Sequence, residues 1–208
     1  MQYITPVLSV ALIHLLAVMS PGPDFIMILR NSLAYSRRSG IYSAIGLGLG
    51  IAVHVTYCLA GIAFIISQSV VVFNIFKYIG AGYLLYVGIK SIRSKRHETV
   101  VGEHHTRDLT KLEALRMGFI TNVTNPKATL FFLSLFTLVI QPATPLWVKL
   151  IMGTEMVVAT MLWFALLAVI ISHRSVRQRV TGIQHYLERF MGGILILLGI
   201  KVALEKHK

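Results

Sequence analysis

The stretch Ser20-Pro21-Gly22-Pro23-Asp24 interrupts the first apolar run of this sequence, and Asn122-Val123-Thr124-Asn125-Pro126-Lys127 interrupts the fourth. Proline and glycine release backbone groups from the hydrogen-bond ladder of a helix, and lipid offers those groups no partner. Breaks of this kind survive at membrane depth only where they face protein or a water-filled cavity. A pair of breaks at matching positions of two halves is typical of a transporter binding site.

The composition is that of a membrane protein. Of the 208 residues, 55% are hydrophobic and 13% are charged, whereas soluble domains carry about 25% charged residues. The apolar runs have the length of about 20 residues that is needed to cross the hydrocarbon core. We therefore expect an all-α integral membrane protein with six transmembrane helices, the first and fourth broken near the midplane. The six runs cover residues 4–29, 41–66, 70–90, 117–140, 148–172 and 189–204.

The basic residues are distributed unevenly between the loops. The net charge is +12, and fourteen of the twenty Lys and Arg residues lie in the first, third and fifth loops. The opposite loops and the C-terminus hold five, and Lys127 lies within a span. This bias places the odd-numbered loops in the cytoplasm and both termini outside. Because the charges lie between hydrophobic runs, we expect them to orient the chain and not to bind nucleic acid.

The two halves of the chain carry proline, glycine and charged residues at matching positions. Pro23-Asp24 matches Pro126-Lys127 at an offset of 103 residues, and Gly82 to Lys90 matches Gly193 to Lys201 at an offset of 111. Three spans per half is an odd number, so the second half must enter the membrane from the opposite face. The sequence therefore predicts one domain over 1–208, made of repeat one (1–90), a cytoplasmic linker (91–115) and an inverted repeat two (116–208).

Each break also resembles a helix start. Ser20 is a candidate N-cap with Pro21 at the first helical position, and Asn125 is a candidate N-cap with Pro126 following it. Free N–H groups at such helix starts suit an anionic group, such as the carboxylate of a substrate. Asp24 is then a candidate to bind a substrate ammonium or a proton, and Lys127 a candidate to bind a carboxylate. The alternative is that the two ions pair and lock the halves together.

Other polar residues share helix faces with the breaks. Asn122 and Asn125 lie on one stripe of the fourth span, and His54 and Tyr57 lie on a stripe of the second span that also carries Gly46 and Gly50. His54 and Tyr57 either line a cavity or stabilise the interior. Glu155 is either buried or near the outer interface. His14 fits a hydrogen-bonded residue of the core. The candidates for substrate binding and proton coupling are Asp24, Lys127, Asn122, Asn125, His54, Tyr57 and Glu155, and those for the helix breaks are Ser20, Pro21, Gly22, Pro23 and Pro126.

Several classes of site are not expected. Cys58 is the only cysteine, which excludes an internal disulfide and a dithiol electron conduit. His97, His104 and His105 lie in the polar linker without regular ligand spacing, so a solvated linker is favoured over a metal site. The sequence contains no phosphate-binding loop and no nucleophile–base pair. We expect neither an enzyme nor a bound cofactor or metal.

The sequence resembles the lysine exporter superfamily, in particular its homoserine/threonine-resistance branch of amino-acid efflux proteins. The resemblance covers essentially the whole chain and rests on three stretches. These are Met19 to Phe25, Gly80 to Lys90 and, most specifically, Gly118 to Ala128.

This resemblance implies a multi-pass protein of the bacterial inner membrane that exports amino acids by proton antiport, with a homodimer as a further expectation. The substrate would be threonine- or homoserine-like, or another neutral or basic amino acid. The alternative is an exporter of a metal or other small cation, which Asp24, His54 and Glu155 would bind.

Overall fold

Eight α-helices make up the part of the chain that the computed structural model describes, namely residues 3–68, 70–93, 107–139, 144–171 and 174–204. Each expected span corresponds to one long helix or to a pair of shorter ones. The helices are α1 (Ile4–Met19), α2 (Pro23–Ala34), α3 (Arg37–Gln68), α4 (Val70–Ile92), α5 (Lys111–Val123), α6 (Pro126–Val139), α7 (Leu146–Ile171) and α8 (Arg174–Leu204).

The predicted breaks in the first and fourth spans are confirmed, because non-helical residues separate α1 from α2 and α5 from α6. By length and composition α3 and α7 can each cross a membrane, and α1 with α2 forms a third span bent by 56°. Residues Pro126–Phe136 of α6 form a shorter apolar helix. Among the described residues, two helices, or three spans if the bent pair counts as one, are therefore long and apolar enough to cross a membrane.

Two boundaries differ from the expectation. Helix α8 begins at Arg174, so the polar residues before 189 are helical and not a loop. They contain no proline, and hydropathy alone does not detect a helix that continues beyond the apolar run. Helix α5 begins at Lys111, inside the predicted linker, because Thr110 and Glu113 form a capping box. The three histidines of the linker lie outside the described residues.

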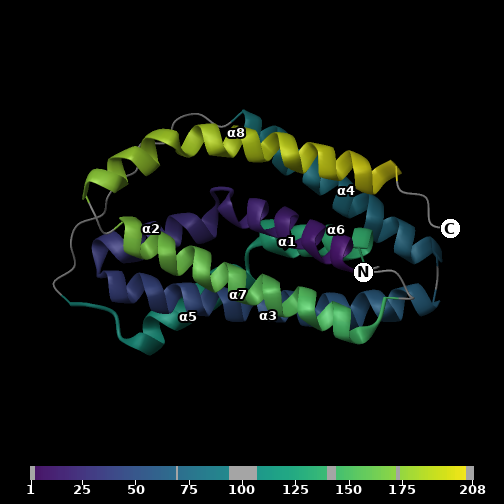
Figure 1. Cartoon of the computed structure of the whole chain (residues 1–208), viewed down its shortest axis with the longest axis horizontal. Helices are drawn as coiled ribbons and strands as arrows, with labels where there is room; N and C mark the ends of the chain where they lie inside the picture. Colours follow the sequence, from purple (N-terminus) through teal and green to yellow (C-terminus); the bar gives the residue numbers. More distant parts are fainter. Residues whose placement is uncertain (1–2, 69, 94–106, 140–143, 172–173, 205–208) are drawn as a thin grey trace.

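The two broken spans lie inside the bundle. Figure 1 shows α1 and α6 between a layer formed by α3 and α7 and a layer formed by α4 and α8. Helix α1 contacts both α7 and α8, and α6 contacts α3, α4 and α8. Buried apolar side chains on both sides of the breaks complete the core, with Phe132 and Leu84 in one cluster and Ile28 and Leu47 in another. Both breaks are thereby held within the protein.

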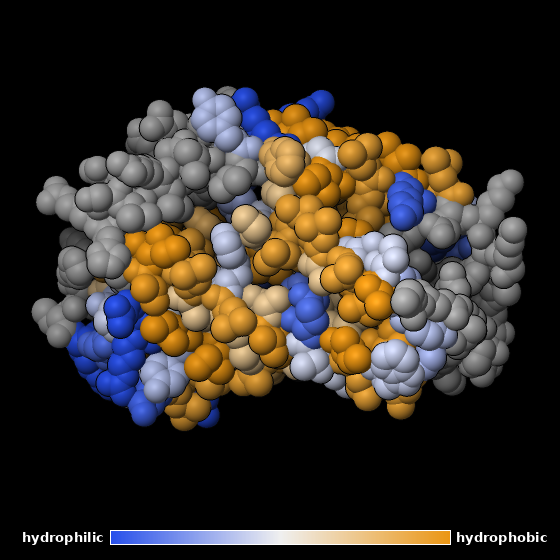
Figure 2. Space-filling view, in the orientation of Figure 1, coloured by the Kyte–Doolittle hydropathy of each residue, from blue (hydrophilic) through white to orange (hydrophobic). Residues whose placement is uncertain are grey.

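The outer surface is apolar around its middle. On the face that Figure 2 shows, hydrophobic residues cover most of the central surface, and the largest group of hydrophilic residues lies at the lower left, with smaller ones at the top, at the right and near the centre. Large aliphatic side chains point outward, with Leu8 63% exposed, Leu162 65% and Leu197 70%. Soluble monomers rarely expose apolar patches of this extent, so the surface suits lipid. Helix α1 begins and α8 ends at one end of the molecule, whereas α3, α5 and α8 begin at the other (Figure 1).

Helices α3 and α5 touch along their backbones. A Cβ added to Gly46 would collide with the carbonyl oxygen of Leu115, and one added to Gly118 would collide with that of Ser43. The hydroxyl of Ser43 donates to the carbonyl of Ala114 at 3.1 Å. Glycine removes the side chain that would separate the helices, so α3 from the first half and α5 from the second pack as one unit.

Just before α5, Asp108 joins the end of the linker to the start of α3. Its carboxylate accepts hydrogen bonds from the hydroxyls of Ser36 and Ser39, each at 2.6 Å. These bonds hold the pKa of the Asp108 carboxyl below its ordinary value of 3.8. This exposed contact is a second link between the two halves of the chain.

Candidate functional site

The first break runs from Ser20 to Gly22. Ser20 is the C-cap of α1, and its N–H donates to the carbonyl of Ala17 at 3.2 Å. Gly22 takes the N-cap position of α2 in an extended conformation. The prediction of Ser20 as an N-cap before a helical Pro21 is therefore wrong. The physical reason is Pro23: a residue that precedes proline is disfavoured in the helical region, so the helix cannot begin before Pro23. Asp24 lies in the first turn, as expected.

The second break is shorter, and here the prediction is confirmed. Helix α5 ends at Val123 and α6 begins at Pro126. The side-chain oxygen of Asn125 accepts a hydrogen bond from the backbone N–H of Lys127 at 3.0 Å. Asn125 is thus the N-cap of α6, with proline at the first helical position.

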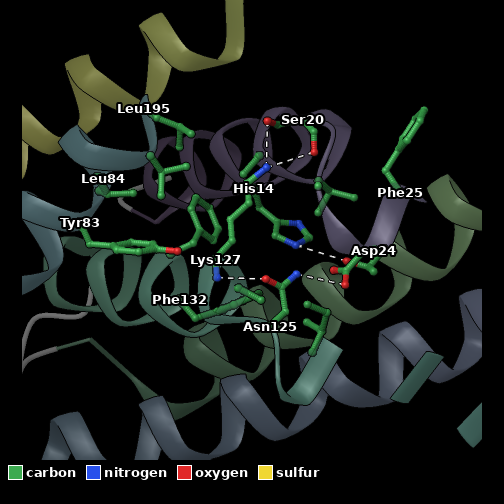
Figure 3. A pocket seen from close by; sticks show the side chains of 18 of the residues that line it. His14, Ser20, Asp24, Phe25, Tyr83, Leu84, Asn125, Lys127, Phe132 and Leu195 are labelled. Atoms are coloured by element: carbon green, nitrogen blue, oxygen red, sulfur yellow. Dashed lines mark hydrogen bonds between the residues drawn. The ribbon is translucent and has the colours of Figure 1, made fainter. Parts of the chain in front are cut away.

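Each break binds the charged residue of the other. The Asp24 carboxylate accepts hydrogen bonds from Asn122 Nδ2 at 2.8 Å and from Asn125 Nδ2 at 3.1 Å. The Lys127 ammonium donates to Ser20 Oγ at 2.9 Å, and to the carbonyls of Ser20 and Pro21 at 3.2 Å each. Figure 3 shows the Asp24–Asn125 and Lys127–Ser20 bonds. We call these interactions the crossed contacts.

The crossed contacts leave the two charges unpaired with each other. Arg107 and Glu113 form an ion pair at the end of the linker, but Asp24 and Lys127, both described, form none together. The alternative in which the two ions pair directly is therefore not what is observed. Neutral amides hold the carboxylate, whereas carbonyls and a hydroxyl hold the ammonium. An opposite charge arriving from outside can approach either ion without first separating an ion pair.

His54 and Tyr57 lie behind Asn122. The Nε2 atom of His54 is 3.0 Å from the carbonyl oxygen of Asn122, and Nδ1 is 2.6 Å from the Tyr57 hydroxyl. A carbonyl can only accept, so Nε2 carries the hydrogen and, in a neutral ring, Tyr57 donates to Nδ1. The ring stacks on Phe132 with 3° between the planes. His54 is thus a fully bonded interior residue that fixes the end of α5.

A cavity of about 50 Å³ lies between the breaks, with room for a few water molecules. Of the predicted residues, it is lined by Ser20, Gly22, Asp24, Asn125 and Lys127. Asn122, His54, Tyr57 and Glu155 are not among its lining residues. Glu155 is half-buried on α7, and its Oε2 atom has no hydrogen-bond partner in the structure.

The sequence did not identify several residues of this cavity. His14 from α1, Tyr83 from α4 and Thr160 from α7 supply further polar groups. The aromatic residues Phe131 and Phe132 from α6 and Phe164 from α7 form apolar walls. His14 was expected in the core, and it is fully buried, but it also faces the cavity. The feature of the sequence that could have identified His14 as a cavity residue is its polar side chain within an apolar run.

The cavity therefore offers one carboxylate and one ammonium, both held by neutral partners and surrounded by apolar walls. A zwitterion carries the two complementary charges. Opposite charges of the ligand would compensate the desolvation of Asp24 and Lys127, which is costly for any ion away from water. This chemistry suits a small amphoteric molecule such as a free amino acid.

Comparison with known proteins places this geometry in context. A family model described as LysE type translocator matches residues 15–206. The threonine efflux protein of Escherichia coli is 25% identical over 201 residues, covering 96% of this chain and 98% of that protein. That of Salmonella typhi is 24% identical, covering 95% and 97%. The membrane protein YahN of Escherichia coli, described as uncharacterized, is 27% identical, covering 89% and 83%. No solved structure matches the chain.

Proposed function

Because this chain belongs to the LysE type translocator family, we propose that it exports a small amino acid across the bacterial inner membrane in exchange for protons. The observation that carries the proposal is that Asp24 and Lys127 line one cavity and form no ion pair with each other. In this mechanism Lys127 binds the α-carboxylate of the substrate. Asp24 binds either its α-ammonium or the exchanged proton, so that substrate and proton compete for one site.

We also propose that the chain crosses the membrane six times as two inverted repeats. A Cβ added to Gly88 on α4 would lie 2.7 Å from the carbonyl oxygen of Gly192 on α8. One added to Gly199 on α8 would lie 3.0 Å from the carbonyl oxygen of Ala81 on α4. The offset of 111 residues relates Gly88 to Gly199 and Ala81 to Gly192. Exchanging α4 and α8 therefore converts one contact into the other. Such reciprocity supports a two-fold axis between antiparallel helices.

The proposed orientation has both termini outside. Arg37 at the start of α3 and Lys111 at the start of α5 lie at the end of the molecule opposite to where α1 begins (Figure 1). Loops rich in Lys and Arg stay in the cytoplasm, which supports the assignment of this end to the inner face. A homodimer and the inner membrane as the location stay predictions.

Two further observations support an amino acid as the cargo. The relatives from Escherichia coli and Salmonella typhi carry the name threonine efflux protein. The described residues contain no group of three or more His, Cys, Asp or Glu side chains that could hold a metal ion. No observation therefore favours the alternative of cation export. The translocator family agrees with the expectation of a transporter and not an enzyme.

The test is transport by the purified protein in proteoliposomes. Counterflow with a panel of labelled amino acids identifies the substrate, and a lumen more acidic than the medium should then drive its accumulation. Asp24→Asn should abolish this gradient-driven accumulation. Its matched control, Asp108→Asn, removes a carboxylate outside the cavity and should retain it.

The outcomes separate the parts of the proposal. Absence of counterflow for every amino acid would contradict amino-acid transport. Gradient-driven accumulation by Asp24→Asn at the wild-type rate would remove Asp24 from the mechanism. Counterflow without any response to the pH gradient would contradict proton exchange while leaving the amino acid as substrate.

A further inference from the structure

His14 provides a polar atom of the cavity that has no partner within the protein. Its side chain is fully buried on α1. Nε2 lies 3.4 Å from the hydroxyl oxygen of Thr160 on α7, whereas Nδ1 forms no hydrogen bond in the structure. Figure 3 shows the ring pointing into the cavity that Asp24 and Lys127 also line.

This unpartnered atom distinguishes His14 from the other polar residues of the cavity. The buried side-chain atoms without partners in the described residues also include atoms of Asn122, Glu155 and Trp163, but none of these residues lines the cavity. Buried polar groups in proteins nearly always have a hydrogen-bond partner. A buried nitrogen without a partner, on a residue that lines the cavity, therefore points to a partner that enters the cavity.

The charges of the cavity restrict what that partner is. Among the lining residues, Asp24 is the one acid and Lys127 is the one Lys or Arg. In the proposed function these two take the ammonium and carboxylate that all amino acids share. The polar groups that remain for the substrate side chain include those of His14, Thr160 and Tyr83, and the other lining residues there are apolar, such as Phe131 and Ile51.

We propose that His14 is a specificity-determining residue, whose Nδ1 forms a hydrogen bond with a neutral polar group in the side chain of the exported amino acid. This inference rests on the proposed function. A neutral imidazole holds one hydrogen, so Nδ1 either donates or accepts, and a hydroxyl satisfies both cases. Thr160 acts as a positioning residue that orients the ring. A cationic side chain would find no second carboxylate among the lining residues.

The experiment is counterflow in proteoliposomes with near-isosteric pairs of amino acids: threonine and valine, serine and alanine, asparagine and leucine. In each pair one member has a polar group that the other lacks. The wild-type protein should prefer the polar member of at least one pair by about tenfold or more, because a site built to hydrogen-bond a substrate rejects the analogue without that group.

His14→Phe keeps an aromatic ring but removes both nitrogen atoms. It should lower this preference about tenfold, by slowing exchange of the polar member while the apolar member is still exchanged. His14→Asn places an amide near the position of Nδ1 and should restore most of the preference. Thr160→Val, which removes only the hydroxyl, should lower it by a smaller factor. Gel filtration and thermal melting in detergent verify that each variant is folded.

The results test the role of His14 separately from the proposed function. If the wild-type protein exchanges no amino acid, the proposed function fails and this inference with it. If it exchanges amino acids but folded His14→Phe and Thr160→Val keep the wild-type preference, only the role of His14 is overturned. Equal slowing of both members of a pair in these variants would also overturn it, as would wild-type exchange of lysine as fast as that of the preferred substrate.

Discussion

Both broken spans restart at a proline, but the two breaks stabilise their charges in opposite ways. Asp24 lies in the first turn of α2, where the positive end of the helix dipole favours a carboxylate. Lys127 lies in the first turn of α6, where the same field opposes an ammonium. Its side chain instead reaches Ser20 and Pro21 at the end of α1, where carbonyls are free to accept.

The N-caps of α2 and α6 also differ. Gly22 caps α2 with no side-chain hydrogen bond, whereas Asn125 caps α6 with its oxygen and holds Asp24 with its nitrogen. The first break thus depends on the second for the partners of its acid, and the second depends on the first for the partners of its base. Neither half has a complete site alone.

The largest expected effect comes from removing the base. Lys127→Met keeps the length of the side chain but leaves Ser20 Oγ and the carbonyls of Ser20 and Pro21 without their donor. Unsatisfied buried acceptors are costly, so we expect a loss of about 3 kcal/mol in the free energy of unfolding. Unfolding in detergent measures it. The matched control is Lys201→Met, on an exposed position of α8. A loss for Lys127→Met no larger than for this control would contradict a stabilising role of the contacts between Lys127 and the first break.

The two capping positions provide the next comparison. Asn125→Ala removes both the cap of α6 and one partner of Asp24, so we expect a loss of about 2 kcal/mol. Gly22→Ala should change stability by about 0.5 kcal/mol or less, because the backbone is extended there and the new Cβ would meet Lys127 Nζ at an ordinary 3.4 Å. Similar melting temperatures for the two variants would contradict the asymmetry between the breaks.

A similarly small effect concerns Asp108, an exposed counterpart of Asp24 whose side-chain partners are two hydroxyls where those of Asp24 are two amides. Water screens this contact, so Asp108→Asn should cost about 0.5 kcal/mol at neutral pH. Because its pKa is lowered on folding, the contribution is complete above the ordinary value of 3.8 and disappears as the pH falls through the folded-state pKa. Unfolding of both proteins between pH 7 and 3 tests this, and a difference that grows on acidification would contradict it.

The sequence was sufficient to predict the two breaks, since proline and glycine within an apolar run interrupt a helix. The helix after the first break was expected to begin too early, at Pro21, because Ser20-Pro21 and Gly22-Pro23 are both plausible helix starts. The restriction on the residue before proline favours the second, and the structure agrees. The start of α5 was also recognisable, because Thr110 and Glu113 have capping-box spacing.

The remaining parts of the site depend on the packing of distant helices. Whether His14 faces lipid, core or cavity is set by the rotation of α1 against α7, and no local pattern in an apolar helix fixes that rotation. The position of Glu155 was also left open, because an acid near the start of an apolar run fits both a buried position and the outer interface; in the structure it is half-buried and does not line the cavity. The crossed contacts likewise depend on how the end of α1 packs against the start of α6, about a hundred residues later in the sequence.

The crossed contacts also have a consequence for biosynthesis. The amides that hold Asp24 come 98 and 101 residues after it in the chain. At a translation rate of about 5–20 residues per second, the ribosome delivers them roughly 5–20 seconds after Asp24 itself. During that interval the nascent first span contains a carboxylate without its final partners, which raises the free-energy cost of placing that span in lipid. The partners that lower this cost are synthesised only after more than half of the chain.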